Sequence, residues 1–161
     1  SAFAIGRSFA ASGDDNSFTV GNGTNYMVYD LDSGDITITS DRRVKDDIVD
    51  SPIGLTFIDK LKPVQFVKKA PSEWPAEFWN LSKLPEDSPE RTSTEKGKKV
   101  QTGLIAQEVK EVIDELDIDF LGWSEQEETG KQELSYISFV VPLVKAVQEL
   151  SAKVKALEDA Q

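Results

Sequence analysis

Apolar residues near the C-terminus repeat at alternating spacings of four and three residues. The series comprises Tyr136, Val140, Leu143, Val147, Leu150, Val154 and Leu157, with valine at the a positions and leucine at most d positions of a heptad. This repeat predicts a helix over 136–161 that associates with copies of itself, because few other apolar elements are available to cover it. Packing of the helix on its own domain is the alternative interpretation.

Proline and charged residues refine the predicted helix. Pro142 lacks a backbone N–H, so the helix should begin near this residue or kink there. Lys153 at g and Glu158 at the next e position are placed to pair across parallel helices. Valine at a with leucine at d favours two strands, although the pattern indicates an oligomer more firmly than it indicates the number of chains.

Residues 1–39 read as β-structure, because short apolar pieces alternate with clusters of Gly, Asn, Asp and Ser. The piece Ser1–Gly6 reappears loosely as Asn16–Gly21, 15 residues later. Further elements are expected as strands over 25–29 and 36–39 and a turn at 32–34. Such pieces are too short to bury a core alone, so we predict the end of a repeating β-fibre in which neighbouring chains supply the missing faces. An ordinary β-meander is the alternative.

The segment between the β-region and the C-terminal helix predicts a small mixed α/β domain. Ser51-Pro52 is a helix-start signal, after which apolar residues recur at helical spacing until Pro63. The remaining elements are expected as strands over 63–68 and 100–105, a helix over 106–115, and a hairpin formed by 120–124 and 131–134 around a turn at 129–130. The chain is therefore an α+β protein, with a β-fibre stub over 1–39 and a second domain over 40–161.

A polar, proline-rich stretch over 70–99 interrupts this domain. It is too long for a plain connection, so we expect a projecting loop. Its aromatic residues Trp74, Phe78 and Trp79 either pin the loop onto its own domain or form a binding patch.

Composition excludes several classes of function. The net charge of −11 argues against a nucleic-acid surface, and no apolar run approaches the 18 residues of a membrane span. The absence of cysteine and histidine removes disulfides and most zinc and haem sites, so we expect no metal and no cofactor. The acidic runs 114–119 and 125–128 lack the spacing of a calcium loop. The chain begins at Ser1 without methionine, which we take to indicate a piece of a longer protein.

A serine and a lysine stand where the two regions meet. Ser40 follows the β-like run 35–39, and Lys45 lies five residues further on. Without histidine or cysteine, a hydroxyl activated by a lysine amine is one of the few nucleophilic arrangements left. Five residues of extended strand span about 17 Å, so the pair requires a sharp hook in the chain or a lysine from a neighbouring subunit. A serine and a lysine at this spacing also occur by chance in most proteins.

The expected reaction of this pair is cleavage of its own chain between Thr39 and Ser40. The Ser40 hydroxyl would attack the preceding carbonyl carbon and convert the amide into an ester that water opens, while Lys45 moves the proton. Arg43 or a backbone N–H would stabilise the oxyanion.

Four sequence blocks resemble the endosialidase-type C-terminal intramolecular chaperone domain of phage tail spikes and fibres. The first is Ser40-Asp41-x-Arg43-x-Lys45, followed by Ile48. The others are IGLTFIDKLKPV over 53–64, TGLIAQEV over 102–109 and YISFVVPLVKAVQEL over 136–150. Together they follow the order of the family across 40–161. A more distant relative of this domain occurs in eukaryotic membrane-bound transcription factors, but the β-region over 1–39 fits the phage setting better.

The resemblance implies a self-cleaving serine endopeptidase with a single turnover. Ser40 and Lys45 inherit the dyad role, Asp41 and Arg43 inherit membership of the motif, and the scissile bond joins Thr39 to Ser40. The resemblance also implies a homotrimer rather than the dimer favoured by the heptad, with a coiled-coil core formed by Val140, Leu143, Val147, Leu150, Val154 and Leu157.

Assembly and location follow from the same resemblance. The domain would act on its own N-terminal fibre region, without nucleic acid or membrane. The fibre would remain in the virion tail, and the chaperone domain would act in the host cytoplasm during assembly. A non-cleaving structural trimerisation cap and a receptor-binding fibre tip, with Trp74, Phe78 and Trp79 as its contact surface, are the alternatives.

Overall fold

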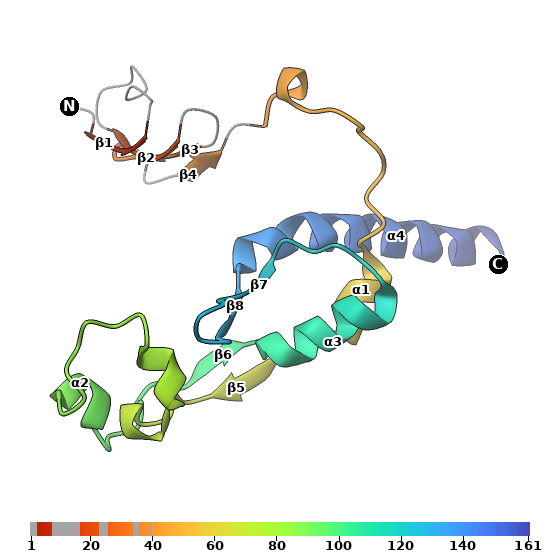
Figure 1. The fold of residues 1–161 in the computed structure, drawn as a ribbon. Helices are drawn as coiled ribbons and strands as arrows, with labels where there is room; N and C mark the ends of the chain where they lie inside the picture. The colour runs from red at the N-terminus through yellow and green to blue at the C-terminus, as the bar shows by residue number, and fades with distance from the viewer. Residues whose placement is uncertain (1–2, 8–16, 23–25, 34–35, 39) are drawn as a thin grey trace. The chain divides into compact units, whose positions relative to one another are not determined.

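The computed structural model describes residues 3–7, 17–22, 26–33, 36–38 and 40–161 (Figure 1). The chain divides into two compact units, 1–49 and 50–161. The described residues form a mixed α/β protein with small sheets and a long C-terminal helix, as the sequence predicts.

The first unit contains a four-stranded sheet. Its strands are β1 (Phe3–Arg7), β2 (Ser17–Asn22), β3 (Tyr26–Asp30) and β4 (Ile36–Ile38), in the order β1-β2-β3-β4. Strands β2, β3 and β4 pair antiparallel, whereas β1 and β2 pair in parallel. The parallel register places Phe3 opposite Phe18 and Gly6 opposite Gly21, so the 15-residue sequence repeat is also the repeat of the sheet. A parallel first pair rules out the simple meander.

Burial in this unit is unusual for a β-sheet. The buried side chains of β2 are polar, namely Ser17 and Thr19, and the neighbouring Phe18 and Val20 are only half-buried. Ile36 and Ile38 of β4 are exposed. Apolar surface on a sheet is normally covered by other parts of the protein. In the single chain, part of the apolar surface of this sheet stays exposed to solvent.

The second unit surrounds a small aromatic core. Its elements are α1 (Leu55–Lys60), β5 (Val64–Phe66), the 3-10 turns η2 (Pro71–Glu73) and η3 (Ala76–Trp79), α2 (Pro89–Thr92), β6 (Gln101–Gly103), α3 (Ala106–Leu116), β7 (Trp123–Glu125), β8 (Gln132–Leu134), η4 (Tyr136–Phe139) and α4 (Val140–Asp159). Strands β5 and β6 pair antiparallel, as do β7 and β8. Figure 1 shows α1 between α3 and α4.

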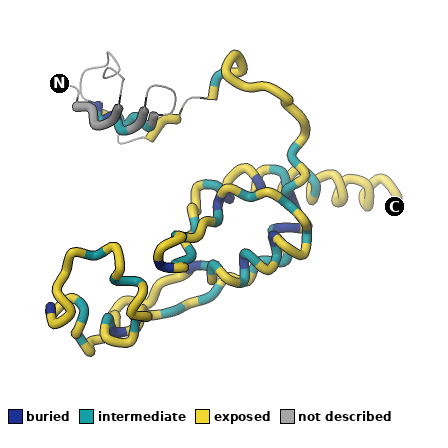
Figure 2. The backbone as a smooth tube through the Cα atoms, in the orientation of Figure 1, coloured by how far each residue is buried: buried dark blue, intermediate teal, exposed yellow. Residues whose placement is uncertain are grey.

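Three phenylalanine rings join these elements. Phe57 of α1 lies 5.0 Å from Phe120, and Phe120 meets Phe139 edge-on at 4.8 Å between ring centroids. Phe57 and Phe139 form the buried cluster with Val109 and Ile113 of α3, and the half-buried Phe120 packs against it. The buried residues come from three elements: Phe57 from α1, Val109 and Ile113 from one face of α3, and Phe139 from η4. The cluster therefore determines how these three elements pack together (Figure 2).

The start of α1 differs from the expectation. The helix begins at Leu55 rather than at Ser51-Pro52, and Gly54 precedes it. The Ser51 hydroxyl instead accepts a hydrogen bond of 3.2 Å from the backbone N–H of Ile53, which forms a local turn. The first turn of α1 is capped from α4, because the N–H of Leu55 donates to a Glu149 carboxylate oxygen at 2.9 Å.

The stretch over 70–99 folds into short turns around two tryptophans. The rings of Trp74 and Trp79 stack 5.4 Å apart, and the Arg91 guanidinium lies over the Trp79 ring at 5.6 Å. The Trp74 indole N–H donates to the carbonyl oxygen of Lys69 at 3.2 Å. These contacts hold the stretch together internally.

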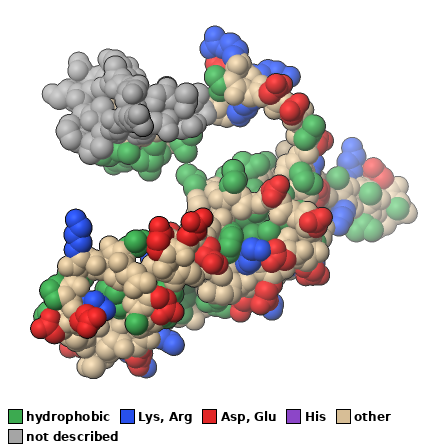
Figure 3. All heavy atoms as spheres, viewed as in Figure 1, with side chains coloured by type: hydrophobic (Ala, Val, Ile, Leu, Met, Phe, Trp, Pro, Cys, Tyr) green, Lys and Arg blue, Asp and Glu red, His purple; other side chains and the backbone are tan. Residues whose placement is uncertain are grey.

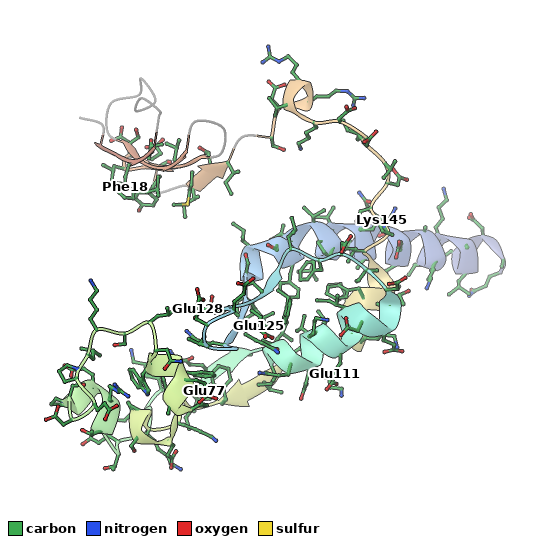
Figure 4. All side chains as sticks on the ribbon, viewed as in Figure 1. Phe18, Glu77, Glu111, Glu125, Glu128 and Lys145 are labelled. Atoms are coloured by element: carbon green, nitrogen blue, oxygen red, sulfur yellow. The ribbon has the colours of Figure 1, made fainter. Side chains whose placement is uncertain are left out.

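Charge on the second unit is mainly acidic. Figure 3 shows Asp and Glu side chains spread over its visible face. Glu111 of α3, Glu125 of β7 and Glu128 of the β7–β8 turn are all exposed (Figure 4). Among the described residues, no group of three acidic side chains is arranged to hold a metal ion. No helix in the described part of the chain is long and apolar enough to span a bilayer.

Candidate functional site

A short 3-10 turn lies between Ser40 and Lys45. The turn, η1 (Arg42–Val44), is closed by the N–H of Val44 donating to the carbonyl of Asp41 and the N–H of Lys45 donating to the carbonyl of Arg42, each at 3.2 Å. The backbone at Asp41 and at Lys45 is extended on either side of it. The chain therefore forms the sharp hook that a pairing of Ser40 with Lys45 requires.

The hook brings the two side chains together. The Lys45 Nζ donates a hydrogen bond of 2.7 Å to the Ser40 Oγ. Both residues belong to one chain, so the contact does not require a lysine from a neighbouring subunit. A nucleophilic hydroxyl within hydrogen-bond reach of a potential base is the minimal arrangement for hydroxyl-based catalysis. Thr39, on the other side of the expected scissile bond, lies outside the described residues.

Contacts between Asp41 and Arg43 stabilise the hook. The Asp41 Oδ1 accepts from the backbone N–H of Arg43 at 2.8 Å, and its Oδ2 accepts from the Arg43 Nη2 at 2.6 Å. The Arg43 side chain and its backbone N–H hold the pKa of Asp41 below its ordinary value of 3.8. The carboxylate in turn raises the pKa of Arg43.

This pairing changes the role expected for Arg43. Sequence reasoning offered its guanidinium as an oxyanion donor, but the structure directs Nε and Nη2 to Asp41. The fork that the Arg43 guanidinium forms with the Asp41 carboxylate was not predicted from the sequence. The available signal is an aspartate at the start of a turn with an arginine two residues later. Asp41 caps the turn as an acidic residue caps a helix.

The hook is open to solvent within one chain. Ser40 and every residue from 42 to 50 are exposed, and Asp41 is half-buried. Asp47 adopts a left-handed backbone conformation with φ of 47°, which ends the hook sharply.

The second candidate element is α4, whose two faces differ. Pro142 and Ala146 are buried on the side that packs against α1, and Glu149 on the same side caps that helix. Gly54 permits this approach, since a Cβ at that position would lie 2.8 Å from both Glu149 carboxylate oxygens and from Lys145 Cγ. Lys145 lies on α4 near this junction (Figure 4).

The heptad residues lie on the other, uncovered face. Their exposed fractions lie between 46% for Leu143 and 68% for Leu157, and the face comprises Val140, Leu143, Val147, Leu150, Val154 and Leu157. Residues 151–161 are all exposed (Figure 2). Packing of the helix on its own domain, the alternative interpretation, thus describes one face of α4 and leaves the heptad face free.

The beginning of the heptad series requires a correction. The helix was expected over 136–161, but Tyr136 belongs to η4, and α4 begins at Val140 with Pro142 in its first turn. The Tyr136 hydroxyl accepts a hydrogen bond of 2.9 Å from the backbone N–H of Leu104. Tyr136 therefore joins α4 to the segment after β6, and it does not belong to the helix.

Comparison with known proteins gives one match. A sequence model of a peptidase family, described as chaperone of endosialidase, matches residues 40–118. The match begins at Ser40, so it includes the hook, α1 and α3. Neither the curated proteins nor the solved structures contain a significant match to this chain.

Proposed function

Because residues 40–118 belong to the chaperone-of-endosialidase family, we propose that this chain trimerises and aligns a phage tail fibre or spike and then releases it by cutting itself. Three copies associate through α4, and this association brings the strands upstream of Ser40 into register. Cleavage between Thr39 and Ser40 then separates the assembled fibre from the chaperone. The fibre stays in the virion tail, and the chaperone domain is left in the host cytoplasm.

The uncovered face of α4 supports association. Fully burying a valine or leucine side chain contributes about 1.5–3 kcal/mol. Six such residues on this face are between 46% and 68% exposed in the single chain. Isolated helical segments of the length of 151–159 are marginal in water, so a helix end without tertiary contacts gains stability from a partner helix. Parallel association of three α4 helices supplies that partner.

The four-stranded sheet of the first unit is the part of the chain that the association would align. Ile36 and Ile38 remain exposed in one chain, as expected for strands whose apolar faces are covered by neighbouring copies. Three separate chains must meet before such pairing yields any stabilisation, and this entropic cost comes first. A coiled coil at the end of each chain raises the effective concentration of the strands and lowers that cost.

The proposed cleavage uses the Ser40–Lys45 hydrogen bond. The neutral Lys45 amine accepts the Ser40 hydroxyl proton as Oγ attacks the Thr39 carbonyl carbon, and the C–N bond breaks as Lys45 returns the proton to the Ser40 nitrogen. The product is an ester between the Thr39 carbonyl and Ser40 Oγ. Water then adds to this ester, leaving a carboxylate on Thr39 and a free hydroxyl and amine on Ser40.

Exposure of the hook favours cleavage after assembly. In one chain, both Ser40 and Lys45 are exposed to solvent. Covering by neighbouring chains would exclude that water from the reacting groups. The site would therefore become active when the strands beside it have paired.

One observation carries this proposal, the 2.7 Å contact between Lys45 Nζ and Ser40 Oγ. Intact mass spectrometry beside light scattering tests it: folded trimer should yield fragments 1–39 and 40–161, and Ser40→Ala should remain whole. Ser124→Ala, an exposed serine of β7, is the matched control and should cleave normally. A wild-type trimer that stays uncut under all folding conditions would leave only the structural cap.

A further inference from the structure

An apolar groove lies beside the heptad face of α4. It has a volume of about 360 Å³, and its walls include Ile58 of α1, Leu61 just after α1, Leu104 after β6, and Tyr136, Phe139 and Leu143. Leu143 is also a d residue of the heptad, so the groove and the heptad face form one continuous apolar surface. A coiled-coil seam alone would not require this extension.

Heptad register identifies what faces the groove. With Val140 at a, Phe139 occupies g and Val144 occupies e. Phe139 precedes α4 but has helical backbone angles, φ −78° and ψ −13°, so the register extends back to it. In parallel coiled coils, a g residue lies opposite the e residue five positions later on the neighbouring helix. Val144 of a neighbouring copy therefore lies opposite Phe139, at the wall of the groove.

The three g–e′ pairs of α4 differ in a consistent way. The last pair, Lys153 with Glu158, is ionic and lies where the helix is exposed on all sides. The middle pair, formed by residues 146 and 151, is Ala with Ser, both of them small. The first pair is apolar, and Val144 is 52% exposed in the single chain. Apolar character thus appears at the one pair that lies beside the groove.

We propose that Val144 of each copy inserts into the groove of the next copy, where α1 and the segment after β6 hold it. Each contact joins two different surfaces, so three of them close into a ring with threefold symmetry. The inference rests on the proposed function, because it presupposes parallel association through α4. The groove requires α1, β6 and η4 to be folded, so the contact favours association of folded copies over unfolded ones.

Disulfide crosslinking tests the contact directly, because the chain has no cysteine of its own. Leu61→Cys combined with Val144→Cys should give reducible dimer and trimer bands on denaturing electrophoresis after mild oxidation. Thr102→Cys with Val144→Cys uses an exposed residue at the rim of the groove and avoids any effect of Leu61 on folding. Leu121→Cys with Val144→Cys is the matched control, since Leu121 is 96% exposed and lies outside the groove, and it should give only background.

A second measurement separates this inference from the proposed function. Val144→Ser should raise the dissociation constant of the trimer at least about tenfold, whereas Leu121→Ser should leave it unchanged. If wild type is a trimer by light scattering but both groove pairs fail to crosslink above the control, the groove contact is overturned and the proposed function stands. If wild type is a monomer, both are overturned.

Discussion

The backbone N–H of Leu55 donates a hydrogen bond to the carboxylate of Glu149, 94 residues further along the chain. The contact ties the first turn of α1 to the side of α4 that carries Pro142 and Ala146. It thereby fixes the rotation of α4 about its own axis, which leaves the heptad face outward. The helix can belong to its own domain and still offer an apolar face to other copies.

Loss of this cap should destabilise the chain. Glu149→Ala removes an acceptor and a negative charge from the start of α1, so the free energy of unfolding should fall by about 1 kcal/mol. Glu149→Gln keeps an acceptor and should cost less. Urea unfolding at fixed protein concentration measures both, with Glu158→Ala on the same helix as the exposed control. Equal losses for the two alanine variants would show that the cap has no specific role.

Gly103 and Tyr136 should behave as a coupled pair. A Cβ on Gly103 would lie 2.5 Å from the Tyr136 hydroxyl oxygen, so Gly103→Ala should cost about 1–3 kcal/mol of stability through overpacking. Tyr136→Phe removes the acceptor of the Leu104 N–H and should cost about 1 kcal/mol. Because Tyr136→Phe also removes the clashing atom, the double variant should lose less than the sum. A double-mutant cycle by urea unfolding measures this, and strict additivity would contradict it.

Asp41 should act on cleavage by positioning Lys45. Asp41→Asn weakens the fork with Arg43 while preserving size, so the hook should open and the rate of cleavage should fall by about 100-fold. Trimer formation, measured by light scattering, should not change, because α4 is untouched. Asp50→Asn, a nearby exposed residue, is the control. A rate for Asp41→Asn equal to that of wild type would mean that the fork is dispensable.

The fork should persist to acid pH. Since the pKa of Asp41 is lowered on folding, its contribution is complete above the ordinary value of 3.8 and disappears as pH falls through the lowered value. Carbon-13 NMR of the Asp41 carboxyl should show a midpoint below 3.8 in wild type and in Arg42→Ala. In Arg43→Ala the midpoint should move up, because Arg43 supplies the lowering contacts. An unchanged midpoint in Arg43→Ala would assign the effect elsewhere.

A charge in the heptad seam should prevent association. Leu150→Asp places a carboxylate at a d position, where association would bury it unpaired, so light scattering should report a monomer. Ala152→Asp adds the same charge to the same helix at f, away from the seam, and should remain associated. Circular dichroism should show the domain folded in both variants. A Leu150→Asp protein of wild-type mass would remove the coiled coil from the mechanism.

Local patterns were sufficient for much of the fold. The helix over 106–115, the hairpin around Gly130 and the 15-residue spacing of the first strands all depend on neighbouring residues or a direct repeat, and all are confirmed. The positive φ of 62° at Gly130 is the backbone state that such a turn requires.

Long-range contacts explain why the predicted start of α1 and the predicted start of the C-terminal helix were wrong. Ser51 resembles a helix cap, but the cap of α1 is Glu149, which no local pattern can identify. Tyr136 matches the heptad spacing, but it lies in η4, before the helix. Its hydroxyl accepts a hydrogen bond from the N–H of Leu104, 32 residues away in the sequence. At the candidate site, sequence spacing named Ser40 and Lys45 but left open whether they meet within one chain, because the answer depends on the dihedral angles of η1.

The parallel register of β1 and β2 also has a consequence for chain length. Partner residues lie 15 positions apart, so a sheet extended in this manner grows in discrete steps of one strand for each block of that size. Insertion of a whole block preserves which side chains face each way in every later strand, whereas an insertion one residue shorter or longer inverts them. Natural variation in the length of such a sheet should therefore occur in whole blocks of 15 residues.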